Sequence, residues 1–263
     1  MNHLLFAKTF YRNHKNHILF GWFLRLGNFF YQLPYIQKRV RQRRDLAEAR
    51  YVLNQIGVIM PAKVYINEFK RKKIWRNKFS LGHADDFDVL MLYLLGRVKK
   101  PEVIIETGVA SGRSSAAILE ALRENGRGRL FSVDLPKFYD GQPELYLTKE
   151  GRTEHSGFIP KGKQPGWLVP QELRKQWSLI LGDSKVELPK LMSQVGKTEI
   201  FYHDSEHSYD SMMCEFQTVW PFIPAGGILL SDDVRWNDAF KDFVEQVKPR
   251  FHYTYDGLGI VIK

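Results

Sequence analysis

The sequence predicts an α/β protein in which helices cover both faces of a doubly wound, mostly parallel sheet. From residue 83 onward, short apolar runs alternate with longer helix-like segments, which is the pattern of a parallel sheet. The strand candidates read as nearly continuous apolar runs, as expected for strands that are buried on both faces. With 263 residues, of which 44% are hydrophobic, the chain can build one such domain and an added segment.

The elements of this domain can be placed in order along the chain. Apolar residues at helical spacing predict a helix over 85–98, and a second helix is expected over 111–124, before the helix-stopping Gly126. A third helix-like run covers 209–222. Strands are predicted over 103–106, 130–134, 178–183, 199–204 and 227–232, and a closing pair over 251–255 and 260–263 joined through Asp256-Gly257.

Residues 135–176 interrupt this alternation. The stretch contains several prolines and glycines together with aromatic residues. Long connections at strand ends commonly carry function in this architecture. We therefore expect 135–176 to form a substrate-side insertion within a domain that spans 81–263.

The first eighty residues differ from the rest in charge. Residues 1–80 contain 17 Lys and Arg but only 3 Asp and Glu, whereas the remainder contains 22 and 26. Segment 17–44 combines large aromatic residues with a dense basic run over 38–44. A charge and a proline interrupt it, so it does not read as a transmembrane helix. We expect 1–80 to be a basic, aromatic helical extension.

The role of this extension stays open between two interpretations. It can pack as a helical arm on the domain or on a second copy of the chain, giving a homo-oligomer. Aromatic and basic segments also lie in membrane interfaces that carry anionic lipid, so 17–44 is a candidate for peripheral membrane contact. Nucleic-acid binding is less favoured, because no RNA-binding signature accompanies the charge. The single cysteine excludes an internal disulfide and fits a reducing, cytoplasmic location, with the inner membrane surface as the alternative.

A glycine motif follows the first predicted strand of the domain. Glu106, Gly108 and Gly112 frame a turn between this strand and the next helix. Glycines at such a turn allow the backbone to approach a ligand closely. The spacing differs from the phosphate-binding G-x-G-x-x-G pattern, so a dinucleotide is less favoured than another nucleotide-like cofactor.

Acidic residues also end the next two strands. Asp134 ends the second strand, where an acid can accept hydrogen bonds from the hydroxyls of a ribose, and Asp183-Ser184 ends the third. Acids in these places are also common helix caps. Their position is informative because ligands of open α/β sheets bind at the carboxyl ends of the strands.

With these motifs, residues 80–263 resemble the class I S-adenosylmethionine-dependent methyltransferases. Glu106 to Gly112 resembles their glycine motif, and Asp134 resembles their ribose-binding acid. The resemblance implies a seven-stranded Rossmann-like sheet in the order 3-2-1-4-5-7-6, with the last inserted strand antiparallel. It also implies that S-adenosylmethionine is surrounded by a set of cofactor-binding residues, namely Glu106, Gly108, Ser111, Gly112, Asp134, Asp183 and Ser184.

Carboxylates at the ends of the fourth and fifth strands could hold a hard metal ion. Asp204, Asp232 and Asp233 resemble the metal-binding set of the magnesium-dependent O-methyltransferases, which include enzymes that modify catechols and macrolide sugars. His207 lies three residues after Asp204, where these enzymes place the catalytic base. A histidine at this position resembles the pattern of the sugar-modifying enzymes. The surrounding stretch is similar to a bacterial family that includes cephalosporin-hydroxylase-like members. Each acid could instead cap the helix that follows it.

The resemblance therefore implies methyl transfer from S-adenosylmethionine to a hydroxyl of a small molecule or saccharide. Mg²⁺ or another divalent cation would be held by Asp204, Asp232 and Asp233, with Asp204 and His207 as the catalytic pair. Two alternatives stay open. One is a metal-dependent, hydroxylase-like reaction, and the other is a non-catalytic membrane-surface or assembly protein that works through residues 1–80.

Overall fold

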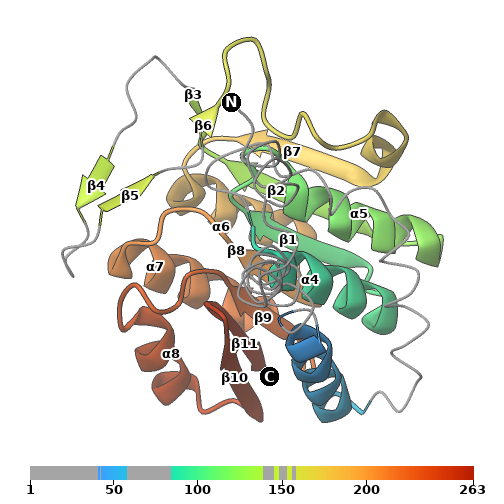
Figure 1. The fold of residues 1–263 in the computed structure, drawn as a ribbon, viewed down its shortest axis with the longest axis vertical. Helices are drawn as coiled ribbons and strands as arrows, with labels where there is room; N and C mark the ends of the chain where they lie inside the picture. The colour runs from blue at the N-terminus through green and yellow to red at the C-terminus, as the bar shows by residue number, and fades with distance from the viewer. Residues whose placement is uncertain (1–40, 42, 58–83, 139–144, 148–152, 156–157) are drawn as a thin grey trace, which may run out of the picture. The chain divides into compact units, whose positions relative to one another are not determined.

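The computed structural model describes residues 41, 43–57, 84–138, 145–147, 153–155 and 158–263. The chain divides into two compact units, Met1–Glu48 and Ala49–Lys263, and the second unit carries the fold (Figure 1). Residues 43–55 are helical. Most of the predicted extension over 1–80 lies outside the described residues, so its boundary and its role stay predictions.

The second unit alternates strands and helices as the sequence predicts. Its helices are α4 (Asp86–Lys99), α5 (Arg113–Asn125), η2 (Gln171–Gln176), α6 (Ser184–Val195), α7 (Tyr209–Val219), η3 (Trp220–Phe222) and α8 (Ala239–Val247). The strands of its main sheet are β1 (Val103–Thr107), β2 (Arg129–Asp134), β7 (Trp177–Leu181), β8 (Ile200–His203), β9 (Ile228–Ser231), β10 (Phe251–Tyr255) and β11 (Leu258–Ile262).

The main sheet has seven strands in the order β10-β11-β9-β8-β1-β2-β7. Strands β7, β2, β1, β8 and β9 run parallel to one another, and β11 is antiparallel to both of its neighbours. This is the order 3-2-1-4-5-7-6 that the methyltransferase resemblance implies. The predicted doubly wound α/β fold, with an antiparallel strand inserted beside the edge strand β10, is confirmed.

Helices cover both faces of this sheet (Figure 1). Successive strand residues point to opposite faces of the sheet, so every second residue of a strand contributes to the same buried layer. Alternate residues such as Ile105, Phe201 and Leu229 belong to one buried cluster with apolar residues of α6, α7 and α8. On the other face, Glu106 meets α5 through hydrogen bonds, and α5 packs against α4. This alternation decides which site residues face which layer.

Element boundaries differ from the prediction by a few residues. The helix predicted over 209–222 ends as α7 at Val219 and continues as the short 3₁₀ helix η3, which contains Pro221. A proline removes a backbone donor and clashes with the preceding turn, so it favours this change. Gly126 ends α5 in the left-handed conformation, as its position predicts.

The stretch over 135–176 is described only in part. It contains β3 (Lys137–Phe138), β4 (Leu145–Leu147), β5 (Thr153–His155) and β6 (Phe158–Ile159), which form two small two-stranded sheets. Its last part contacts the glycine turn, because Gly166 N donates to Ala110 O at 2.9 Å and Leu168 N donates to Ser111 O at 2.9 Å. Its predicted role at the substrate side stays a prediction.

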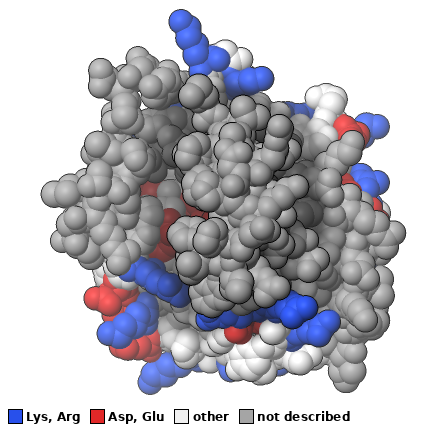
Figure 2. Space-filling view, viewed as in Figure 1, with Lys and Arg blue, Asp and Glu red and all other residues white. Residues whose placement is uncertain are grey.

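None of the described helices is both long and apolar enough to span a membrane. Among the described residues visible in Figure 2, Lys and Arg side chains (blue) are interspersed with Asp and Glu side chains (red). This mixture agrees with the sequence, in which the positive surplus is carried by residues 1–80.

Candidate active site

The glycine turn between β1 and α5 packs directly against the segment that carries Asp204. Gly108 has a φ of +82°, and a Cβ added there would lie 1.9 Å from the carbonyl oxygen of Asp204. Asp204 N in turn donates to Thr107 O at 2.8 Å. Only glycine permits both this conformation and this approach. Gly108, a predicted cofactor residue, and Asp204, a predicted metal ligand, are therefore neighbours.

Gly112 occupies a similarly tight position at the start of α5. Its φ is +83°, and a Cβ would meet Gly166 Cα at 2.7 Å and Val169 Cγ2 at 2.8 Å. Ser111 beside it is buried, and its carbonyl oxygen accepts a hydrogen bond from Leu168 N. The turn is thus fixed from outside by the end of the 135–176 stretch.

Glu106 lies behind the turn, fully buried on the face covered by α5. Its carboxylate accepts hydrogen bonds from Ser114 Oγ and Ser115 Oγ at 2.6 Å and from Ser132 Oγ at 2.7 Å. Burial raises the pKa of Glu106 to about 7, although the three serine hydrogen bonds oppose this. The carboxylate therefore joins β1, β2 and α5 beneath the turn, where no solvent reaches it.

Asp134 ends β2 and binds the outer side of the same turn. Its Oδ1 accepts from Val109 N at 3.0 Å, while its Oδ2 is buried and has no hydrogen-bond partner in the described structure. Burial raises its pKa, against hydrogen bonds from Val109 and Ala110. A buried acceptor without a donor is costly, so Oδ2 is suited to a donor that a ligand would bring.

Asp183 and Ser184 both have partners within the protein. Asp183 caps α6, with its carboxylate accepting from Lys185 N at 2.9 Å, and this is the capping role that the sequence left open. The hydroxyl of Ser184 donates to Glu215. Beside them, the apolar side chains of Leu135 and Leu181 are 61% and 56% exposed at the ends of paired strands.

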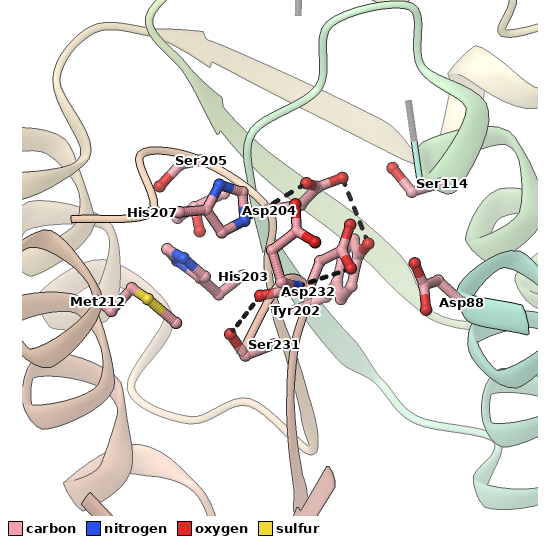
Figure 3. Close-up of polar contacts among 12 residues, drawn as sticks. Asp88, Ser114, Tyr202, His203, Asp204, Ser205, His207, Met212, Ser231 and Asp232 are labelled. Atoms are coloured by element: carbon pink, nitrogen blue, oxygen red, sulfur yellow. Dashed lines mark hydrogen bonds and ion pairs between the residues drawn. The ribbon is translucent and has the colours of Figure 1, made fainter. Parts of the chain in front are cut away.

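The carboxylates of Asp204 and Asp232 lie at the ends of the adjacent strands β8 and β9 (Figure 3). Tyr202 Oη donates to Asp204 Oδ2 at 3.3 Å, and Asp233 N donates to Asp232 Oδ1 at 2.7 Å. Neither acid caps the following helix, because Ser208 caps α7 and Asp238 precedes α8. Asp233 adopts a φ of +50°, a conformation that is uncommon outside glycine.

A further carboxylate, Asp88 of α4, joins this cluster, although it was not among the predicted site residues. Asp88 is 1% exposed, its Oδ2 accepts from Asp85 N at 3.0 Å, and its Oδ1 is buried without a partner. The charge of Asp232 helps to raise the pKa of Asp88, so the two acids act on each other electrostatically. The signal in the sequence was the run of acids Asp85, Asp86 and Asp88, which reads as an ordinary acidic first turn of a helix.

The acids of this cluster raise one another's pKa values. Burial and then the charges of Asp232, Asp88 and Asp233 raise the pKa of Asp204 well above its usual value. Burial and the charges of Asp232 and Asp85 do the same for Asp88, and burial raises the pKa of Asp232 to about 6. Among the described residues, no group of three His, Cys, Asp or Glu side chains is arranged as a metal site.

His207 lies beside Asp204, on the loop between β8 and α7 (Figure 3). Its Nε2 is 3.9 Å from Asp204 Oδ1 and is buried without a hydrogen-bond partner. Asn237 Nδ2 donates to the backbone carbonyl of His207 at 2.8 Å, and the rings of Trp236 and His207 have centroids 4.8 Å apart. Burial, with a smaller contribution from the charge of His203, lowers the pKa of His207 to about 3. Its imidazole is therefore neutral at physiological pH.

The structure thus brings together the glycine turn, Asp134, Asp204, Asp232 and His207 along the carboxyl edge of β1, β2, β8 and β9. Such an edge, where the strand order changes direction beside β1, is where open α/β sheets bind ligands. Asp183 lies next along the edge, after β7.

Comparison with known proteins agrees with this geometry. Residues 105–234 match the family model described as a methyltransferase domain. That range begins in β1 at the glycine motif and ends directly after Asp232 and Asp233. No curated protein matches the chain.

Among solved structures, the calicheamicin methyltransferase CalS11 is 16% identical, with a TM-score of 0.50 over 84% of this chain and 92% of that one. The methyltransferase PaMTH1 of Podospora anserina is 16% identical, with a TM-score of 0.47 over 82% and 94%. An O-methyltransferase from Bacillus cereus is 13% identical, with a TM-score of 0.45 over 82% and 97%. At these identities the likeness concerns the fold, and the CalS11 match supports the Rossmann-like arrangement. Residues 105–234 are therefore similar in sequence to a methyltransferase domain, on a fold that CalS11 shares.

Proposed function

We propose that this chain is an S-adenosylmethionine-dependent methyltransferase that acts on a hydroxyl group of a small molecule or saccharide, with the help of a divalent cation. The observation that carries the proposal is the position of His207 and Asp204. A neutral imidazole and a carboxylate lie side by side on a segment that is packed against the glycine turn of the cofactor site. A proton acceptor is thereby held close to the place where a methyl donor would bind.

Several residues of the chain suit the cofactor. The glycine turn lies at the start of α5, at the carboxyl edge of the sheet, and the orphaned Oδ2 of Asp134 suits a ribose hydroxyl. The exposed apolar side chains of Leu135 and Leu181 could cover the faces of an adenine. In this proposal Glu106 and Ser111 support the turn from below, and Asp183 and Ser184 border the adenine side.

The acidic cluster fits a hard cation in its chemistry. All of its donors are carboxylate oxygens, which Mg²⁺ prefers, and the like charges of the partly buried Asp204 and Asp232 are costly unless a cation offsets them. Asp204, Asp232 and Asp233 would hold the ion after a rearrangement of their side chains, because no three described side chains stand in ligating positions. A bound divalent cation would lower the pKa of a coordinated hydroxyl.

The proposed reaction is an in-line displacement. The acceptor hydroxyl loses its proton to His207 Nε2, and its oxygen forms the new bond to the methyl carbon. The bond between that carbon and the sulfonium sulfur breaks, and S-adenosylhomocysteine leaves. With a pKa of about 3 in the free protein, His207 is a weak base, so the reaction needs an acceptor hydroxyl that is more acidic than a free alcohol.

Calorimetric titration tests the two ligands separately. We expect S-adenosylmethionine to bind the full-length chain with and without Mg²⁺. We also expect Mg²⁺ to give a binding signal that is lost in Asp232→Ala but retained in His207→Ala. Retention of the Mg²⁺ signal in Asp232→Ala would contradict the proposed ligand set.

An acceptor screen of diols and saccharides then tests the base. Methylation of an acceptor should fall by about 100-fold to 10,000-fold in His207→Ala, the range expected for loss of a general base. Binding of S-adenosylmethionine should be unchanged in this variant, because His207 lies outside the glycine turn. Methylation of carbon, nitrogen or sulfur acceptors alone would contradict the assignment to hydroxyls.

A further inference from the structure

Glu215 of α7 is a buried carboxylate that neither the cofactor site nor the proposed base uses. It is 1% exposed, and four side chains donate hydrogen bonds to it. Its Oε2 accepts from Thr107 Oγ1 at 2.5 Å and lies 2.8 Å from His203 Nδ1, while its Oε1 accepts from Ser205 Oγ at 2.6 Å. Ser184 supplies a further hydrogen bond.

The candidate active site has two halves. The cofactor half holds the glycine turn, Asp183 and Ser184, and the acid-and-base half holds Asp204 and His207. The donors to Glu215 come from both. Thr107 directly precedes Gly108 at the end of β1, and Ser184 follows Asp183 at the start of α6. His203 and Ser205 are the two neighbours of Asp204 in the chain. The carboxylate of Glu215 is therefore fixed to the cofactor half on one side and to the acid-and-base half on the other.

His203 connects Glu215 to the proposed base, His207. His203 is fully buried, and its ring packs edge-on against the ring of His207, with centroids 5.2 Å apart (Figure 3). Burial acts to raise the pKa of Glu215, but the charge of His203 and the hydrogen bonds from His203, Ser184 and Ser205 outweigh it and leave that pKa lowered. Glu215 is thus an ionised acceptor for all of its donors.

The buried Glu106 differs from Glu215, because its hydrogen-bond partners all lie around the glycine turn. Its partners Ser114, Ser115 and Ser132 belong to α5 and β2, on the other face of the sheet. All of them support the glycine turn. The partners of Glu215 instead span two adjacent strand ends and a helix start.

We propose that Glu215 is a positioning residue that couples the cofactor half of the site to the half that carries Asp204 and His207. The inference rests on the proposed role of His207 as base. A shift of Thr107 or Ser184 when the cofactor binds is transmitted through the shared carboxylate to His203 and Ser205. Binding of the cofactor then adjusts the base before an acceptor is present.

The test uses S-adenosylhomocysteine as the probe and the imidazole resonances of the histidines as the readout, so it needs no acceptor. The signal of His207 is assigned by its loss in His207→Ala. In the wild type we expect S-adenosylhomocysteine to shift this signal. In Glu215→Gln, which keeps the shape but removes the charge, we expect S-adenosylhomocysteine still to bind while the His207 shift is largely lost.

Two further variants separate coupling from general loss of structure. Thr107→Val removes one donor on the cofactor side and should also reduce the His207 shift, even if Glu215→Gln folds poorly. Glu120→Gln alters another buried acid, paired with Arg123 on α5, and should leave the shift intact. Once an acceptor is known, kcat should fall by about 10-fold to 100-fold in Glu215→Gln, as for other residues that orient a site residue.

The outcomes that overturn the inference are specific. The coupling would be refuted if S-adenosylhomocysteine did not shift the His207 signal in the wild type. It would also be refuted if the shift kept its full size in both Glu215→Gln and Thr107→Val. These results concern positioning alone. The hydroxyl specificity and the base role are refuted separately, by the acceptor screen and by the activity of His207→Ala.

Discussion

At the scale of single residues, the buried Glu106 gives the protein a definite dependence of stability on pH. Its pKa is about 7 in the folded protein and about 4.5 when exposed. The folded state therefore holds a proton that the unfolded state loses, and the contribution to stability is present below the lower pKa and is lost as pH rises through the upper one. The loss is on the order of 3 kcal/mol at most.

Glu106→Gln should remove this dependence. The amide oxygen can still accept from the serines, and their hydroxyls can rotate to meet the amide hydrogens. The free energy of unfolding in urea, measured at about pH 5 and about pH 8, should therefore change less in Glu106→Gln than in the wild type. An equal fall in both proteins would show that Glu106 is not the responsible group.

Asp88 makes the same kind of contribution, because its charge also opposes folding when the acids near it are ionised. Asp88→Asn should increase the free energy of unfolding at neutral pH in the absence of divalent cations, by about 1 kcal/mol, since it relieves repulsion with Asp204 and Asp232. Asp210→Asn, an exposed site in the first turn of α7, is the matched control and should slightly destabilise. A loss of stability in Asp88→Asn would mean that its hydrogen bonds outweigh the repulsion.

At the scale of elements, the turn between β1 and α5 is predicted to tolerate no side chain at Gly108. In Gly108→Ala the new Cβ would meet the backbone of Asp204, so neither segment could keep its place. Gly126→Ala is the control, because its φ of +68° is similar but no atom lies within 4 Å of the added Cβ.

We expect Gly126→Ala to cost about 1 kcal/mol from backbone strain alone. Gly108→Ala should cost clearly more, and it should also abolish binding of S-adenosylmethionine in calorimetry. Equal unfolding midpoints for the two variants would refute the close packing of this turn on Asp204.

The sequence predicted the elements of the sheet and their order well, since buried parallel strands and helical periodicity leave strong patterns. It predicted the positions of Asp204 and Asp232 from their places at strand ends. It could not predict that Asp88 joins them or that Glu215 binds four donors, because a single acid in an amphipathic helix looks like any solvated or capping residue. Only the packing of α4 and α7 on opposite faces of the sheet shows their partners.

At the scale of the whole molecule, the sheet separates two kinds of buried acid. Alternation along β1 directs Glu106 toward α5 and Thr107 toward Glu215 of α7. The acids that could hold a cation lie between these layers at the strand ends, where the glycine turn also lies. Folding, cofactor binding and cation binding are therefore expected to depend on one another.

This dependence can be measured as a linkage between pH, cation and stability. The pKa of Asp232 is raised from 3.8 to about 6 on folding, so its contribution to stability falls as pH rises between those values. The pKa of His207 is lowered from 6.5 to about 3, so its contribution rises with pH over the overlapping range. The raw pH profile mixes the two effects, and the difference between the wild type and Asp232→Asn separates them, because His207 contributes to both proteins.

In the absence of divalent cations, the wild type should lose stability relative to Asp232→Asn as pH rises from about 4 to about 6. Mg²⁺ should raise the unfolding midpoint of the wild type at neutral pH and reduce this relative loss, because a ligand that binds only the folded state stabilises it. It should have a smaller effect on Asp232→Asn. A cation effect of equal size in both proteins would place the ion elsewhere, and a difference profile that is flat with pH would show that Asp232 is not held at a raised pKa.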